Sequence, residues 1–122
     1  MLMKNNTLQK FVLSCSISDA GVAYLSSALQ HNAGIRLLSL AHNKGITNAG
    51  AVALSGMLKE NKTLQELYLH GTSLGEEGAG GLINSLVQNI AMTELWLPKG
   101  LQEYCNKHSD YYRVKHRIRL KL

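Results

Sequence analysis

A chain of 122 residues, of which 45% are apolar, is long enough to form one modest domain with a buried core. It contains no run of about 18 apolar residues, which excludes a membrane-spanning helix, and its N-terminal segment lacks the unbroken apolar core of a secretory signal. A cytoplasmic location is therefore expected, although a secreted chain whose signal has been removed would look the same. The formal net charge of +5 arises entirely in residues 106–122, because residues 1–105 hold seven basic and seven acidic side chains.

Four segments of the chain share a strand-like motif, in which one apolar residue is followed three and five positions later by two more. The motifs begin at Leu8, Ile35, Leu64 and Met92, so the repeat period is 27, 29 and 28 residues. The alternation at the end of each motif places two apolar side chains on one face of a strand. Strands are predicted at 10–14, 37–41, 66–70 and 94–98.

A helix-like series follows each of the first three motifs. In the first unit it consists of Ile17, Gly21, Leu25 and Leu29, spaced four residues apart, which is typical of one face of a helix. Helices are predicted at 19–30, 48–60 and 76–88. The residues expected to begin these helices are Ser18, Thr47 and Gly75, with acidic or amide side chains in the first turn. The residues expected to end the units in a left-handed conformation are Asn32, Asn61 and Asn89. The glycines that we expect where each helix approaches its strand are Gly21, Gly50 and Gly78.

This repeat resembles the ribonuclease-inhibitor-like class of leucine-rich repeats, which also occurs in the receptor domains of NOD-like immune proteins. The resemblance implies an α/β solenoid, a short right-handed horseshoe with a parallel sheet on its concave face and helices on its convex face. It further implies a buried Asn or Cys after each strand. Asn43 matches this position, Thr72 replaces it in the next unit, and Cys15 matches if one residue is deleted. Residues 1–98 are assigned to the repeats and 99–122 to a basic C-terminal cap.

The two ends of the chain depart from the repeat. At the N-terminus, Leu2, Leu8, Phe11 and Leu13 would leave an apolar end and an open strand edge. Three explanations compete: a fragment of a longer array, an end covered by a partner or by homodimerisation, and a tolerated edge. At the C-terminus we predict a helix near 101–105, a second short helix capped by Ser109, and an edge strand at 118–122.

The concave face supplies the main candidate binding site, because residues between the leucines point away from the core. A column formed by Val12, Ser39, Tyr68 and Trp96 crosses all four strands, and aromatic residues are enriched among binding hot spots. The flanking candidates are Lys10, Glu66, His70 and Glu94. We expect a protein or a pathogen-derived ligand to bind here. The family resemblance implies innate immune recognition as a more specific role. Alternatively, the C-terminal segment covers Trp96.

A second candidate is a basic patch in the C-terminal segment, which would bind polyanions such as nucleic acid, anionic lipid or a bacterial surface polymer. Its residues are Arg113, Lys115, Arg117, Arg119 and Lys121. No enzymatic activity, metal or cofactor is expected, because the histidines and cysteines lack the spacing of a metal site. Ser14, Cys15 and His70 have no orienting acid in reach of a catalytic arrangement.

Overall fold

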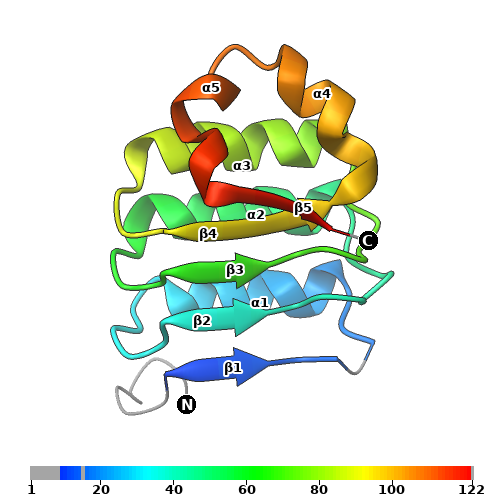
Figure 1. Cartoon of the computed structure of the whole chain (residues 1–122). Coiled ribbons are helices and arrows are strands. Elements are labelled where there is room, and N and C mark those ends of the chain that lie inside the picture. Colours follow the sequence, from blue (N-terminus) through cyan, green and yellow to red (C-terminus); the bar gives the residue numbers. More distant parts are fainter. Residues whose placement is uncertain (1–8, 15, 122) are drawn as a thin grey trace.

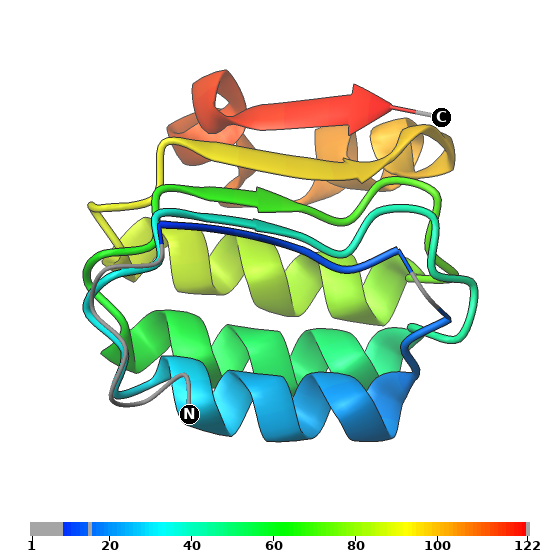
Figure 2. The same cartoon turned by 90° about the horizontal axis from the view of Figure 1, so that it is seen from below.

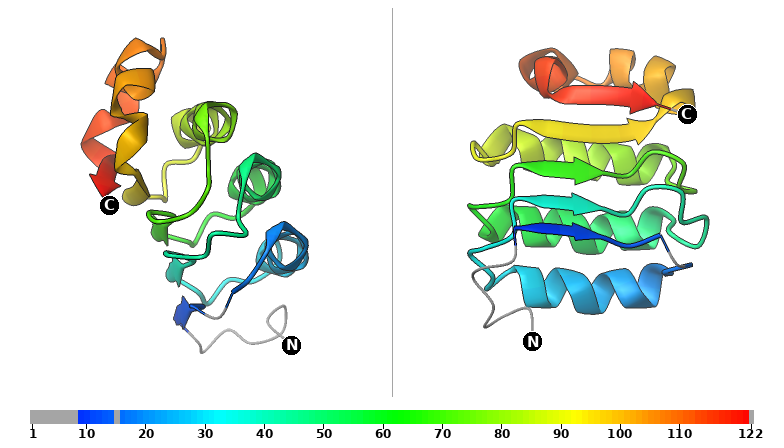
Figure 3. Two further views of the ribbon diagram at one scale, coloured as in Figure 1. Left: turned by 90° about the vertical axis from the view of Figure 1, so that its right-hand side faces the viewer. Right: turned by 60° about the horizontal axis from the view of Figure 1, so that its bottom comes forward.

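The computed structural model describes residues 9–14 and 16–121, and it confirms the leucine-rich repeat solenoid. Strands and helices alternate along the repeats: β1 Lys10–Val12, α1 Asp19–Leu29, β2 Leu37–Ser39, α2 Asn48–Glu60, β3 Glu66–Tyr68, α3 Glu76–Gln88 and β4 Glu94–Pro98. All strands join one five-stranded parallel sheet in the order β1-β2-β3-β4-β5 (Figure 1). The three repeat helices form a single layer on one side of this sheet (Figure 2), and the strands line the inner side of the curve in the end-on view (Figure 3).

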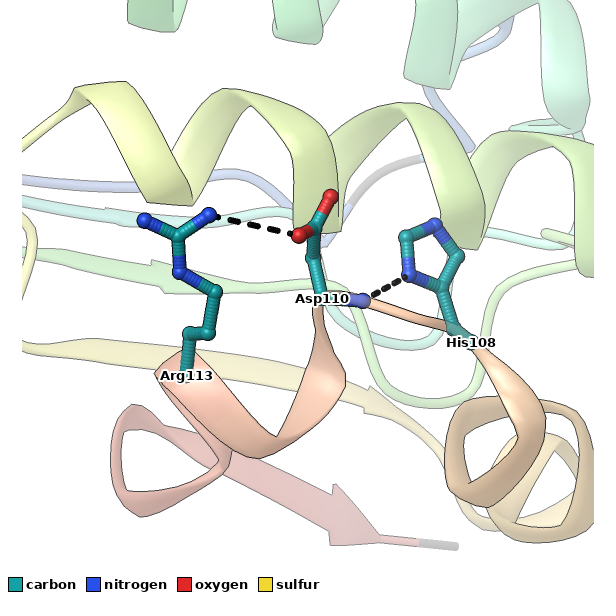
Figure 4. A network of polar contacts seen from close by, with 3 residues as sticks. All are labelled: His108, Asp110 and Arg113. Carbon is teal, nitrogen blue, oxygen red and sulfur yellow. Dashed lines mark hydrogen bonds and ion pairs between the residues drawn. The ribbon is translucent and has the colours of Figure 1, made fainter.

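The C-terminal segment closes the last repeat. Its elements are η2 Lys99–Leu101, α4 Gln102–Lys107, α5 Tyr111–Val114, η3 Lys115–Arg117 and the edge strand β5 Ile118–Lys121, which pairs in parallel with β4. We predicted that Ser109 caps the second short helix, but α5 begins one residue later, with Asp110 at the N-cap position. The carboxylate of Asp110 lies 3.4 Å from Arg113 Nη1, and the backbone N–H of Asp110 donates to His108 Nδ1 (Figure 4).

Register between the strands aligns the leucines of successive repeats. Leu38, Leu67 and Leu95 are Cα partners across β2, β3 and β4, and all three are fully buried. Burying one such side chain contributes roughly 1.5–3 kcal/mol relative to leaving it in water. No helix in the described ranges is long and apolar enough to cross a bilayer.

The first three strands are shorter than predicted, since each has three residues where we expected five. The backbone ladder continues beyond them, with Leu40 N donating to Tyr68 O and His42 N donating to His70 O. The turn then needs left-handed residues, with φ of 66° at His42 and 75° at Gly71. A Cβ on Gly71 would collide with the His42 ring, so glycine is required there for both conformation and space.

Buried asparagines join each repeat to the one before it. The Asn61 side chain is 3% exposed, and its Nδ2 donates to the carbonyl oxygens of Leu29 (2.7 Å) and Asn32 (3.2 Å). Its Oδ1 accepts from the backbone N–H groups of Thr63 and Leu64. The predicted left-handed conformation is wrong, because Asn61 and Asn89 are extended and Asn32 has no positive φ. These asparagines are needed for their side-chain amides, which satisfy buried backbone groups.

The asparagine expected after the strand is confirmed at Asn43. It is 1% exposed, donates to the carbonyl oxygens of Leu13 and Leu40, and accepts from the backbone N–H of Ile17. Thr72 occupies the same place in the next repeat and donates only to Leu69 O, within its own turn. Cys15, the predicted third member, lies outside the described residues.

The N-termini of α2 and α3 are capped by the preceding repeat. Asp19 Oδ1 accepts from the backbone N–H groups of Thr47 and Gly50, and Asn48 Oδ1 accepts in the same way from Gly75 and Gly78. Ser18, Thr47 and Gly75 occupy the N-cap positions, as predicted, but the side chain of Ser18 makes no capping hydrogen bond. The close approach at Gly50 and Gly78 also differs from our expectation: a Cβ would meet these capping side chains and the preceding apolar residue, and not a strand.

Replacing Asp19 with Ala is expected to lower the free energy of unfolding by about 1 kcal/mol, the typical value of one lost N-cap. Burial raises the pKa of Asp19, but hydrogen bonds from the Thr47 hydroxyl and from the backbone of Thr47 and Gly50 outweigh it and lower that pKa overall. Urea unfolding measures the change. Asp19→Asn is the control, since Asn48 performs the same role one repeat later; an equal loss in both variants would contradict the capping role.

Candidate functional site

The residues between the leucines form three columns on the strand face. The middle column contains Val12, Ser39, Tyr68 and Trp96, as predicted, and continues to Arg119 on β5. Along this column the exposed chemistry changes from apolar at Val12, which is 63% exposed, through aromatic on β3 and β4, to basic on β5. Aromatic and basic side chains are therefore neighbours where β3, β4 and β5 lie side by side.

The two central aromatic rings stack on each other. The ring centroids of Tyr68 and Trp96 are 4.5 Å apart with planes inclined by 27°, and both residues are half-buried. Offset stacks of this kind contribute beyond the area that they bury. The centroid of the His70 ring lies 5.2 Å from that of Trp96 and 6.1 Å from that of Tyr68, so the cluster extends beyond the end of β3 into the following turn. Both rings are thus fixed on a rigid sheet while part of their surface remains accessible.

Two carboxylates hold the polar ends of these rings. Tyr68 Oη donates to Glu66 Oε1 at 2.6 Å, and Trp96 Nε1 donates to Glu94 Oε1 at 2.8 Å. Each glutamate lies two residues before its aromatic partner, so ring and carboxylate share one face of the strand. Glu66 and Glu94 are themselves Cα partners across β3 and β4. We call Glu66, Tyr68, His70, Glu94 and Trp96 together the aromatic site.

The hydrogen bond to Glu66, partial burial, and the charges of Glu66 and Glu94 raise the pKa of Tyr68 to about 12. In the unfolded chain the phenol ionises near its ordinary value of 10.0. This contribution to stability is therefore complete below that pH and is lost as the pH rises through about 12. An NMR titration of the Tyr68 ζ-carbon is expected to show the raised pKa, with Glu66→Ala moving it back toward 10; a wild-type midpoint near 10 would contradict the hydrogen bond.

The two histidines of neighbouring turns contact each other. His42 and His70 have ring centroids 5.0 Å apart in an edge-to-face arrangement, and His70 Nδ1 is buried with no hydrogen-bond partner recorded. Burial, together with the nearby His42 and Lys121, lowers the pKa of His70. In the described ranges no three His, Cys, Asp or Glu residues come close enough to hold a metal ion.

The cap reaches the aromatic site through one side chain. Lys121 Nζ on β5 lies 5.1 Å from the centroid of the Trp96 ring, a cation–π contact. The alternative in which the C-terminal segment covers Trp96 therefore holds in part, since Trp96 still keeps intermediate exposure.

The remaining predicted site residues, Ser39, Lys10 and Val12, do not belong to the aromatic site. Ser39 is buried beside it on β2, with 9% exposure, whereas Lys10 and Val12 are on β1, two strands from Tyr68 and so roughly 10 Å away. The sequence analysis missed the hydrogen bonds by which Glu66 and Glu94 hold the rings of Tyr68 and Trp96. The repeated Glu-x-aromatic pattern on two registered strands, Glu66 with Tyr68 and Glu94 with Trp96, is the signal that could have shown it.

The basic patch is only partly formed. Arg113, Lys115, Arg119 and Lys121 are exposed, but Arg117 points into the protein, where its guanidinium donates to the carbonyl oxygens of Leu86, Asn89 and Met92 at 2.7–2.8 Å. Burial lowers the pKa of Arg117. Including Arg117 in a surface patch was therefore wrong, because this side chain satisfies the end of α3. Periodicity could not reveal this role, since the cap interrupts the repeat.

Comparison with known proteins agrees with this architecture. A leucine-rich repeat family model matches residues 31–55. Over 91 residues the chain is 36% identical to mouse NACHT, LRR and PYD domains-containing protein 14, which aligns 74% of this chain with 9% of that protein. It is 35% identical to mouse ribonuclease inhibitor over 91 residues, 74% of this chain and 19% of the inhibitor. The chain thus spans less than a fifth of either relative.

Two solved structures share the fold. The leiomodin-1 actin-binding site 2 superposes with a TM-score of 0.65 at 28% identity, covering 76% of this chain and 57% of that one. The tropomodulin C-terminal domain of Caenorhabditis elegans superposes with a TM-score of 0.80 at 15% identity, covering 99% and 78%. This chain is a leucine-rich repeat protein. Its repeats are distantly homologous to those of ribonuclease inhibitors and of NACHT, LRR and PYD proteins.

Proposed function

We propose that the chain is a protein-recognition module that binds its partner on the strand face, at the aromatic site. Leucine-rich repeat domains generally act as protein-interaction modules and use the extended concave surface of the solenoid. The observation that supports this choice of site is the Tyr68–Trp96 stack, which is outside the leucine core and yet rigidly held. Rings fixed before binding lose little conformational entropy when a partner contacts them.

Selection from a random peptide library tests the proposal. Peptides are selected on the wild-type chain and rebound to Tyr68→Ser and Trp96→Ser variants, whose folding is checked by circular dichroism. Tyr24→Ser is the matched control, because Tyr24 is 82% exposed on helix α1, on the opposite side of the sheet. Binding is expected to fall at least about tenfold in the site variants only. Peptides that bind all variants equally would contradict the proposal.

The relatives supply two first protein probes: a ribonuclease, from the name ribonuclease inhibitor, and actin, from the leiomodin structure. The innate immune role implied by the NACHT, LRR and PYD relatives stays a prediction.

A second candidate function is polyanion binding by the cap, favoured by the exposure of Arg113, Lys115 and Arg119 on successive elements. Such binding should weaken steeply between low and physiological salt, because released counterions drive it. A triple Gln substitution of these residues should abolish the binding of a heparin or DNA probe and leave the selected peptides bound. Probe binding that is insensitive to both salt and substitution would contradict this candidate.

A further inference from the structure

The carboxylates of the aromatic site have no cation of their own. The ion pairs recorded for residues 9–14 and 16–121 join Lys107 to Glu103 and Arg113 to Asp110, both in the cap. Glu66 and Glu94 are neighbours across two strands, and like charges placed directly opposite each other destabilise a sheet. Their recorded hydrogen bonds use only Oε1 of each carboxylate. Two acidic groups thus face the same surface, and neither forms an ion pair among the described contacts.

The aromatic surface beside them already accommodates a cation. Lys121 Nζ lies over the Trp96 ring, but it forms no ion pair with Glu94 among the described contacts. The ammonium group of lysine behaves as a compact point charge, and its attraction to an aromatic ring at an exposed site is weak. Lys121 therefore marks a cation position over Trp96 that a better-fitting group could take.

A guanidinium group fits this arrangement better. It is planar and stacks on aromatic faces, and its fork of N–H donors can bond two carboxylate oxygens at once. Glu94 accepts from the Trp96 indole N–H and so lies beside the ring, while Glu66 is its Cα partner on the neighbouring strand, about 4.8 Å away, and adds to the negative charge there. Charge complementarity and ring geometry thus favour the same kind of partner residue.

We propose that the aromatic site binds an arginine side chain of a partner protein, stacked on Trp96 in place of Lys121 and hydrogen-bonded to Glu94, with Glu66 adding a second negative charge one strand away. This inference rests on the proposed function and specifies the chemistry of its partner. Lys121 then acts as an intramolecular competitor that covers the ring until the partner displaces it.

Trp96 is the single tryptophan of the chain, so its fluorescence reports this site directly. The probes are three short capped peptides that differ only in carrying arginine, lysine or citrulline, the last being an uncharged analogue of arginine with nearly the same shape. At physiological salt the arginine peptide is expected to produce a saturable change in fluorescence, with affinity at least about tenfold above that of the citrulline peptide. The lysine peptide should be intermediate.

Variants separate the roles of the charges. Glu66→Gln/Glu94→Gln should weaken the arginine peptide at least about tenfold, whereas Lys121→Gln should strengthen it several-fold. Glu60→Gln/Glu77→Gln is the matched control, with the same change in net charge on exposed positions of α2 and α3, and should leave affinity unchanged. Equal binding of arginine and citrulline peptides, or no effect of the Glu66/Glu94 change, overturns the inference. A larger change in Trp96 fluorescence with an acidic peptide than with the arginine peptide also overturns the inference, because the site would then bind an anion beside Lys121.

The library selection distinguishes this failure from failure of the proposed function. If selected peptides depend on Tyr68 and Trp96 but contain no arginine and bind the Glu66/Glu94 variant normally, only the arginine inference fails. If no selected peptide depends on the two rings, the proposed function fails as well.

Discussion

Replacing Asn61 with Ala is expected to lower the free energy of unfolding by about 3–5 kcal/mol, a large part of the stability of a domain this small. The side chain is 3% exposed and bonds four backbone groups in two repeats. Alanine leaves the Thr63 and Leu64 N–H groups without this acceptor, and each orphaned buried donor costs about 1–3 kcal/mol. The Leu29 and Asn32 carbonyl oxygens lose one donor each but still accept from the Asn32 N–H and the Thr63 hydroxyl. Urea unfolding, followed by circular dichroism, measures the change.

Asn61→Asp is the informative control for this prediction. It keeps an oxygen that accepts from Thr63 and Leu64, but it places a carboxylate against the carbonyl oxygens of Leu29 and Asn32. The loss should therefore persist at neutral pH and diminish in mild acid, where the protonated group can donate. A loss below about 1 kcal/mol in Asn61→Ala would show that the ladder is dispensable.

Replacing Arg117 with Ala is expected to lower the free energy of unfolding by about 2–3 kcal/mol, although Arg117 lies outside the repeats. Its guanidinium donates to three carbonyl oxygens at and just beyond the end of α3, and so attaches the cap to the last repeat. Hydrogen bonds from a charged donor contribute more than neutral ones, while the partial exposure of the residue lets water replace some of that contribution.

Arg119→Ala is the matched control, since it removes the same charge from the same segment. Arg119 is exposed, and its recorded bonds to His116 and Ile118 carbonyl oxygens are 3.1 and 3.5 Å long, so we expect a change within about 0.5 kcal/mol. Equal effects of the two substitutions would indicate that net charge, and not the attachment of the cap, sets the stability.

The fold could be predicted from the sequence because the apolar strand motif occurs four times in one chain. Leu38, Leu67 and Leu95 occupy equivalent positions, and each repeat confirms the assignment of the others. Helices α2 and α3 begin and end where their apolar spacing predicted. The column of Tyr68 and Trp96 followed from the same alternation, because side chains in a strand can point only to one face or the other.

Interactions between repeats were the part that sequence reasoning could not supply. Asn61 fits a left-handed helix stop as well as a buried amide, and only the position of Leu29 in the neighbouring repeat decides between the two roles. Arg117 fits an exposed basic patch equally well until the end of α3 is placed beside it. A residue's own spacing indicates its face, whereas its partners about thirty positions away depend on how the repeats stack.

The capping of α2 and of α3 by the repeat before each bears on how such an array can grow. Asp19 caps the start of α2 and Asn48 caps the start of α3, so a duplicated unit would bring its own cap for the helix that follows. Whole repeats could therefore be inserted or deleted during evolution without leaving a helix start unsatisfied. Glu76 occupies the equivalent position of the last unit, and it lines a hollow together with Glu103 and Lys107 of the cap helix α4.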